Sequence, residues 1–285
     1  LVMASSQLLG NHGAWADWIG YGPSTQPIGG LAYLWDYPEE GLPAGSTSIF
    51  PDHLAGRLLS ISALAGLIRR ERTGEGAHTS VAQAEAVAQI IGDQIMKAGL
   101  NPGSVEPTGN RRERGAPWGV YPSAGTDQWV AITVRNDEDW RGLVGAMGTP
   151  EWAEDEKLAT VSGRQAAHDM IDEKLTAWTG GMSKRIATAT LQMFGVPSAP
   201  MYTTGDQLSD PHYQARGYGR WLDQQGLGWM AFEGPAFHTT GMEDIQFFQA
   251  PFIGEHTRAI ARDLIGLEDD AVQKYIDAGV LEVTE

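Results

Sequence analysis

The sequence predicts a mixed α/β fold, and three features of the chain support this. Apolar residues between Leu54 and Ile68 recur at steps of three and four, which is typical of a helix that packs on one face. Residues 129–134 are rich in β-branched and aromatic side chains and are typical of a strand. With 42% hydrophobic residues, the 285-residue chain can build the core of one large or two modest domains.

The first hundred residues are predicted to combine one strand, a loop and helices packed against a sheet. Residues 10–50 are rich in glycine, proline, tryptophan and tyrosine, a composition that favours loops lining a binding site. The long helix is expected to end at Gly74, after three arginines within residues 69–72, because glycine and cations favour a helix C-terminus. In chain order we expect a strand, a short helix, the long helix, an extended stretch and a further helix, at about 1–6, 24–35, 54–74, 78–81 and 82–98.

The rest of the chain is predicted to form a compact α+β unit followed by strands and loops. Residues 101–122 are typical of a linker at a domain boundary, because they combine an Asn-Pro-Gly turn with a charged loop between glycines. After the strand at 129–134, helices are expected at about 137–147, 150–158, 163–179, 183–194 and 260–264.

Charge and cysteine content exclude several classes of function. The chain has 20 basic and 36 acidic residues, a net charge of -16, which argues against nucleic acid or an anionic membrane surface as its partner. It has no cysteine, which excludes disulfides, thiolate metal sites and cysteine nucleophiles, and its seven histidines lack a metal-binding spacing. There is no apolar run of membrane-spanning length and no leader pattern. We therefore expect a soluble, cytoplasmic protein without a bound metal.

Asp52 decides the functional interpretation, and the sequence leaves two interpretations open. It follows Pro51 at the predicted start of the long helix, where an aspartate caps well because its carboxylate accepts an amide hydrogen of the first turn. The same amides and the helix dipole would lower the pKa of this carboxylate and aim it, so that it could attack an activated acyl carbon. Asparagine caps about as well as aspartate but is no carboxylate nucleophile, so Asp52→Asn separates the two.

Other candidate residues have weaker signals. His53 is typical of a solvated side chain in a first helical turn and is given no role. Arg111, Arg112 and Arg114 either hold a phosphate or carboxylate or are solvated charges, and the flanking glycines favour a mobile loop at a site. The ten tryptophans either form an acyl pocket or sugar platform or belong to the core and interfaces.

Short motifs are spread over nearly the whole chain. They are Gly20-Tyr21, Gln26, Gly29-Gly30-Leu31, Asp52 with Ala55-Gly56, the run 72–78, Ala84-Glu85-Ala86, Gly109-Asn110, the runs 119–122 and 195–200, Asp210-Pro211-His212 and the run 254–257. In this order they resemble the class III CoA-transferases, the carnitine, formyl-CoA and bile-acid CoA-transferase group that includes the α-methylacyl-CoA racemases.

The resemblance implies an acyl-CoA:carboxylate CoA-transferase that uses the CoA thioester as a substrate and needs no cofactor. Asp52 would attack the thioester, and the released thiolate would convert the mixed anhydride into an aspartyl-CoA thioester that a carboxylic acid acceptor then attacks. Tyr21, Gln26 and the 111–117 loop, with Arg111, Arg114 and Gly115, would line the acyl site. Charged residues replace most of the family's loop glycines here, so a different acyl group is expected.

Three rival functions remain open. Racemases of this family use a histidine near position 21 and a glutamate near position 136, and this chain has Tyr21 and Asn136, which favours transfer over epimerisation. The chain could be a structural half of a heteromeric transferase. In that case the assembled complex would stay fully active after Asp52→Asn. A glycan-active protein would need a carboxylate pair that the sequence does not display.

The resemblance also implies domain organisation and assembly. Residues 1–115 and 210–285 would belong to a Rossmann-like large domain, and 116–209 would form a smaller α+β domain. Relatives carry about a hundred further N-terminal residues that contact the CoA nucleotide, so we expect the large domain to be incomplete here. An interlocked homodimer, or a second chain that supplies the missing portion, is therefore expected, while the acyl donor and acceptor acid stay unnamed.

Overall fold

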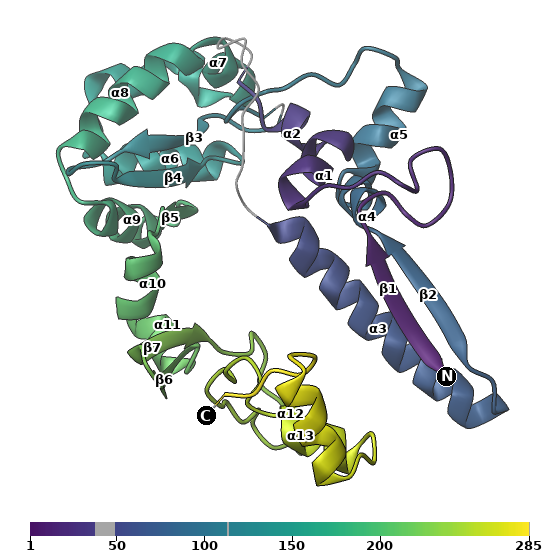
Figure 1. Ribbon diagram of the computed structural model, residues 1–285. Helices are drawn as coiled ribbons and strands as arrows, with labels where there is room; N and C mark the ends of the chain where they lie inside the picture. The colour runs from purple at the N-terminus through teal and green to yellow at the C-terminus, as the bar shows by residue number, and fades with distance from the viewer. Residues whose placement is uncertain (38–48, 113, 285) are drawn as a thin grey trace. The chain divides into compact units, whose positions relative to one another are not determined.

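The computed structural model describes residues 1–37, 49–112 and 114–284 of the chain. Its helices and strands form a mixed α/β fold, which confirms the predicted class (Figure 1). The chain divides into two compact units, Leu1–Met201 and Tyr202–Glu285. The predicted boundaries at 115 and 209, and the Rossmann-like character of the larger domain, stay predictions.

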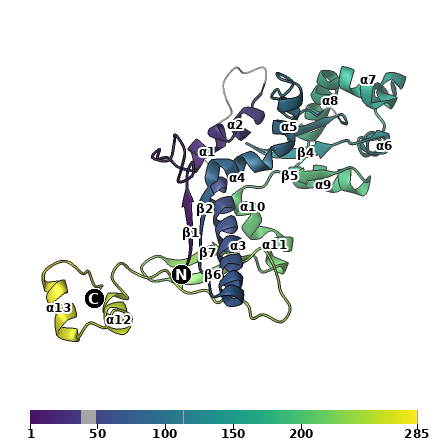
Figure 2. The same cartoon turned by 90° about the vertical axis from the view of Figure 1, so that its right-hand side faces the viewer.

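The first unit begins with a two-stranded parallel sheet against which a long helix packs. Strand β1 (Val2–Gln7) pairs in parallel with β2 (Ala77–Ala82) along its whole length. Helix α3 (Phe50–Thr73) lies between the two strands in sequence and alongside both in space (Figures 1 and 2). Parallel neighbours need such a crossover, because the chain must return to the same end of the sheet before it can pair.

Glycines set the end of α3 and its distance from the sheet. Gly74 follows the helix with φ +75° and its N–H donates to the carbonyl of Arg70, so the predicted stop is confirmed. Gly66 is buried inside the helix, and a Cβ there would lie 2.8 Å from Cγ1 of Val2. The helix therefore packs closely against β1 at Gly66, where it has no side chain.

Two predicted helices are each divided in the structure. The helix expected at 24–35 is α1 (Gly22–Ile28) followed by α2 (Leu31–Leu34), because Gly30 between them adopts φ +84°. The helix expected at 82–98 is α4 (Gln83–Ile90) and α5 (Gly92–Leu100), because the backbone leaves the helical region at Ile91. The expectation of loop structure at 38–48 lies outside the described residues.

The rest of the first unit is an antiparallel sheet packed with helices. Strand β4 (Trp129–Thr133) pairs with both β3 (Trp118–Pro122) and β5 (Ser198–Pro200). The helices are α6 (Asp137–Ala146), α7 (Val161–Ala166), α8 (His168–Gly180) and α9 (Lys184–Met193). The helix expected at 150–158 is instead two short 3-10 helices, η1 (Glu151–Glu154) and η2 (Glu156–Ala159). They are separate because the backbone of Asp155 leaves the helical region at ψ +123°, and its carboxylate accepts the N–H of Lys157.

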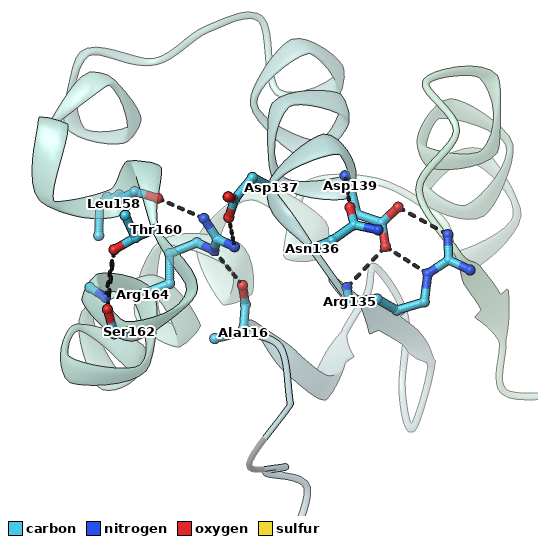
Figure 3. Close-up of polar contacts among 10 residues, drawn as sticks. Ala116, Arg135, Asn136, Asp137, Asp139, Leu158, Thr160, Ser162 and Arg164 are labelled. Atoms are coloured by element: carbon cyan, nitrogen blue, oxygen red, sulfur yellow. Dashed lines mark hydrogen bonds and ion pairs between the residues drawn. The ribbon is translucent and has the colours of Figure 1, made fainter.

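This sheet and its helices enclose a continuous apolar core. Its fully buried members include Val130, Ile132, Leu143, Ile171, Leu175 and Leu191. Beside the core lies the fully buried side chain of Arg164, whose guanidinium donates to the carbonyls of Ala116 and Leu158 and to the Asp137 carboxylate (Figure 3). A buried charge is tolerated when hydrogen bonds replace its hydration in this way. Arg164 thus ties the segment before β3 to η2 and α6.

The second unit consists of short helices and one hairpin. Helices α10 (Thr204–Ser209) and α11 (Pro211–Ala215) precede the antiparallel strands β6 (Gly219–Gln224) and β7 (Gly228–Glu233). The helix predicted near 260 is α12 (Thr257–Asp263), and an unpredicted helix, α13 (Asp269–Asp277), follows it.

Candidate functional site

Asp52 lies in the first turn of α3, but it is not the cap of this helix. Ile49 precedes the first helical residue without a side-chain cap, and Asp52 is the third residue of the helix. The cap interpretation is therefore wrong. Pro51 is tolerated ahead of Asp52, because the first helical positions do not need an amide hydrogen. The Asp52 side chain is exposed and remains at the helix end where the dipole favours a negative charge.

The two carboxylate oxygens of Asp52 have different surroundings. Oδ1 accepts a hydrogen bond from Nε2 of Gln83 at 3.2 Å. Oδ2 faces the backbone of Gly22, where a Cβ would lie 2.3 Å from it. A side chain at position 22 would therefore displace the carboxylate or be displaced by it. Gln83 fixes one oxygen, and Gly22 leaves room for the other.

Strand pairing explains why these residues meet. Gln83 is the first residue of α4 and directly follows β2, so it lies at the carboxyl end of the parallel β1–β2 pair. Gly22 is the first residue of α1, and both α1 and α4 pack against α3. Ligand sites of parallel sheets lie at the carboxyl ends of the strands, where helix N-termini gather. Asp52 occupies such a position.

The structure exposes Tyr21 and buries Gln26. Tyr21 precedes the helix next to Gly22, and its side chain is 83% exposed. Gln26 is only 2% exposed, so it belongs to the buried face of α1. Tyr21 is thus exposed and directly precedes the glycine that faces Asp52. The substrate contacts predicted for Tyr21 and Gln26 stay predictions.

The predicted loop residues Arg111, Arg114 and Gly115 belong to different surroundings. Arg111 forms ion pairs with Asp169 and Asp172 of α8, and its hydrogen bond holds the pKa of the Asp169 carboxyl below its usual range. Arg114 is exposed. Gly115 is buried with φ +101°, and a Cβ there would lie 2.3 Å from the carbonyl oxygen of Val134, so this position requires glycine.

A polar cavity of about 240 Å³ lies next to Arg111, and Asp172 and Tyr121 also line it. The Tyr121 hydroxyl donates to Oδ1 of Asp172 at 2.7 Å, and burial raises the pKa of this phenol. His168 accepts the N–H of Trp118 through Nε2, and burial lowers the pKa of the imidazole below 6.5 against the attraction of Asp172. Asp52 is not among the lining residues, so the predicted site residues fall into two groups.

Sequence reasoning missed Gln83, Gly22 and Asp172. For Gln83 a signal existed, because a polar residue directly after a strand lies where parallel-sheet sites form. Gly22 and Asp172 depend on contacts between distant segments. Across residues 1–37, 49–112 and 114–284 there is no cluster of three or more metal-ligating side chains. Within the same ranges, each helix is too short or too polar to cross a lipid bilayer.

Comparisons with known proteins identify the family of the chain. The family model described as "CoA-transferase family III" matches residues 1–257. A protein of Mycobacterium tuberculosis named as a probable CoA-transferase is 32% identical over 99% of this chain. The succinyl-CoA–D-citramalate CoA-transferase of Chloroflexus aurantiacus is 28% identical over 95% of the chain. The crystal structure of a CaiB/BaiF family protein from Brucella suis superimposes on 93% of the chain with a TM-score of 0.82 and 27% identity.

The chain spans only part of each of these proteins. It covers 36% of the mycobacterial protein, 67% of the Chloroflexus enzyme and 68% of the Brucella protein.

Proposed function

The chain belongs to CoA-transferase family III, and from this premise we propose that it transfers CoA between carboxylic acids with Asp52 as the covalent nucleophile. One observation carries the proposal. Asp52 presents an exposed carboxylate at a helix N-terminus, with Oδ1 held by Gln83 and Oδ2 next to the side-chain-free position of Gly22. This arrangement supports attack by Oδ2.

The proposed reaction conserves the energy of the thioester bond. Oδ2 of Asp52 attacks the carbonyl carbon of the acyl-CoA, and the CoA thiolate leaves, which produces a mixed anhydride. The thiolate then attacks Cγ of Asp52 and expels the first carboxylic acid as its carboxylate, leaving an aspartyl-CoA thioester. The acceptor carboxylate repeats these steps in reverse, and its acyl group leaves as the new CoA thioester. Water must be excluded, because it would hydrolyse either intermediate.

Epimerisation of an acyl-CoA is less well supported. At position 21, directly before Gly22, the chain has a tyrosine where these racemases use a histidine. Asn136 caps α6, with its side-chain oxygen accepting the N–H of Asp139 at 2.9 Å, so it supplies no acid. Exchange of the α-proton in deuterated water without an acceptor acid would favour epimerisation over transfer.

Assembly with a second polypeptide belongs to the same proposal. Apolar side chains on α3, among them Ile61 and Leu64, are largely exposed, which supports coverage by another surface. A second copy or a different chain would then contribute to the site. Sedimentation velocity together with activity at several protein concentrations would test this, and full activity of a monomer would contradict it.

The nucleophile can be tested by mass spectrometry. The wild-type protein is incubated with a panel of acyl-CoAs and carboxylic acids, and the peptide that contains Asp52 is examined for a CoA or acyl adduct. We expect an adduct with every active donor, none with Asp52→Asn, and a loss of activity of at least about 10³-fold in that variant. Its melting temperature should be nearly unchanged, because Asp52 is exposed and caps nothing. A fully active Asp52→Asn protein would exclude Asp52 as the nucleophile.

A further inference from the structure

We propose that Gln83 is a further catalytic residue, which donates a hydrogen bond to Oδ1 of Asp52 when negative charge develops on that oxygen. The inference rests on the proposed function, since it concerns the steps in which Cγ of Asp52 is attacked. Its basis is the contact of 3.2 Å between Nε2 of Gln83 and Oδ1. This is a direct contact with a reacting atom.

The surroundings of Gln83 indicate that its amide serves the carboxylate. The Oε1 atom is buried and has no hydrogen-bond partner among the residues that the structure describes. A buried acceptor without a partner is unfavourable, so packing alone would be better served by an apolar side chain of the same length. The amide nitrogen, in contrast, has a partner, and this partner is Asp52.

The charge of Asp52 selects the orientation of this amide. An ionised carboxylate has only acceptors, so the NH₂ group of Gln83 must face it, and the opposite orientation would set two acceptors against each other. A neutral donor also differs from an arginine or lysine at this place. It orients the carboxylate without forming an ion pair that would weaken the nucleophile.

The donor acts at particular steps of the reaction. When Oδ2 attacks the acyl-CoA, charge leaves Asp52, and a hydrogen bond to Oδ1 gives no advantage. When the CoA thiolate then attacks Cγ, the electron pair of the Cγ–Oδ1 double bond moves onto Oδ1. This oxyanion forms next to Nε2 of Gln83, and the double bond reforms as the carboxylate leaves with Oδ2. The acceptor carboxylate attacks the same carbon later, so the same donor serves that step.

Gln83→Met tests the inference, because methionine has a similar length and no donor. Gln89→Met is the matched control, since Gln89 is an exposed residue of the same helix. Rapid quenching after addition of an acyl-CoA, followed by mass spectrometry of the Asp52 peptide, separates the acyl anhydride from the CoA thioester. For Gln83→Met we expect kcat to fall about 10²- to 10³-fold with little change in KM, and the acyl anhydride to accumulate. Gln89→Met should behave as the wild type.

The outcomes separate this inference from the proposed function. A Gln83→Met protein with wild-type kcat, or with a lower kcat but the wild-type ratio of the two adducts, would overturn the role of Gln83 and leave Asp52 as nucleophile. A wild-type protein without any adduct would overturn the proposed function and this inference together. If Gln83→Met does not fold, Gln83→Glu keeps the shape without a donor, and wild-type activity in that variant would overturn the inference.

Discussion

Helices α3 and α8 belong to one unit, yet they bury different kinds of residue. The buried residues of α8 include Ile171 and Leu175, which join the apolar core beside β4. Helix α3 buries Pro51, Ala55 and Gly66, while Ile61 and Leu64 remain about 60% exposed. The region around β4 is therefore stabilised by large side chains. In the region that carries Asp52, α3 instead packs through small residues, so its backbone lies close to the neighbouring elements. The larger apolar side chains of this helix remain exposed.

The largest effect should come from shortening a leucine in each region. Leu143→Ala removes a fully buried side chain of the β4 core, and we expect the free energy of unfolding to fall by about 2–5 kcal/mol. Leu64→Ala in α3 removes a side chain that is 60% exposed and should change it by less than about 0.5 kcal/mol. Urea denaturation of both variants measures the difference. Equal losses would show that α3 is as deeply packed as the β4 core.

Two glycines of α3 provide an intermediate test. Gly56 has open space around its Cα, so Gly56→Ala should raise the free energy of unfolding by about 0.5–1 kcal/mol through helix propensity. Gly66→Ala has the same gain in helix propensity, but its Cβ would lie 2.8 Å from Cγ1 of Val2. This overlap should lower the free energy of unfolding by about 1 kcal/mol in total. Thermal denaturation of both variants shows whether each one is more or less stable than the wild type. A stabilised Gly66→Ala protein would contradict the close approach of α3 and β1.

The contrast between the two regions also marks what the sequence can predict. The apolar period from Leu54 to Ile68 correctly predicts the helix, because the period depends on local geometry. It does not tell which face is buried, since Ala55 and Gly66 are buried while Leu64 is exposed. Burial depends on which other elements pack against the helix. The divisions at Gly30 and Ile91 were missed for a related reason, as neither residue excludes a helix by itself.

The candidate site was predictable only in part. Asp52 could be found from its place at a helix start and from the motifs around it. Its hydrogen bond with Gln83 spans 31 positions and exists because β2 brings residue 83 to the end of the sheet. The ion pairs of Arg111 with α8 likewise depend on folding of distant segments. Residue types and local order are therefore readable from the sequence, while the partners of each side chain are not.

The remaining effect concerns pH and should be confined to the β4 region. Burial lowers the pKa of His168 below 6.5, with Arg111 acting in the same direction and Asp172 and Asp169 opposing it. Below pH 6.5 the unfolded chain therefore binds a proton that the folded protein does not, so the free energy of unfolding falls as the pH decreases toward the lowered pKa. This fall is at most about 1.4 kcal/mol per pH unit for one group. His168→Gln should remove it, whereas His238→Gln, at an exposed position, should retain it. Urea denaturation at pH 7.5 and pH 5.5 measures the difference. A His168→Gln protein that loses as much stability as the wild type would exclude burial of this imidazole as the cause.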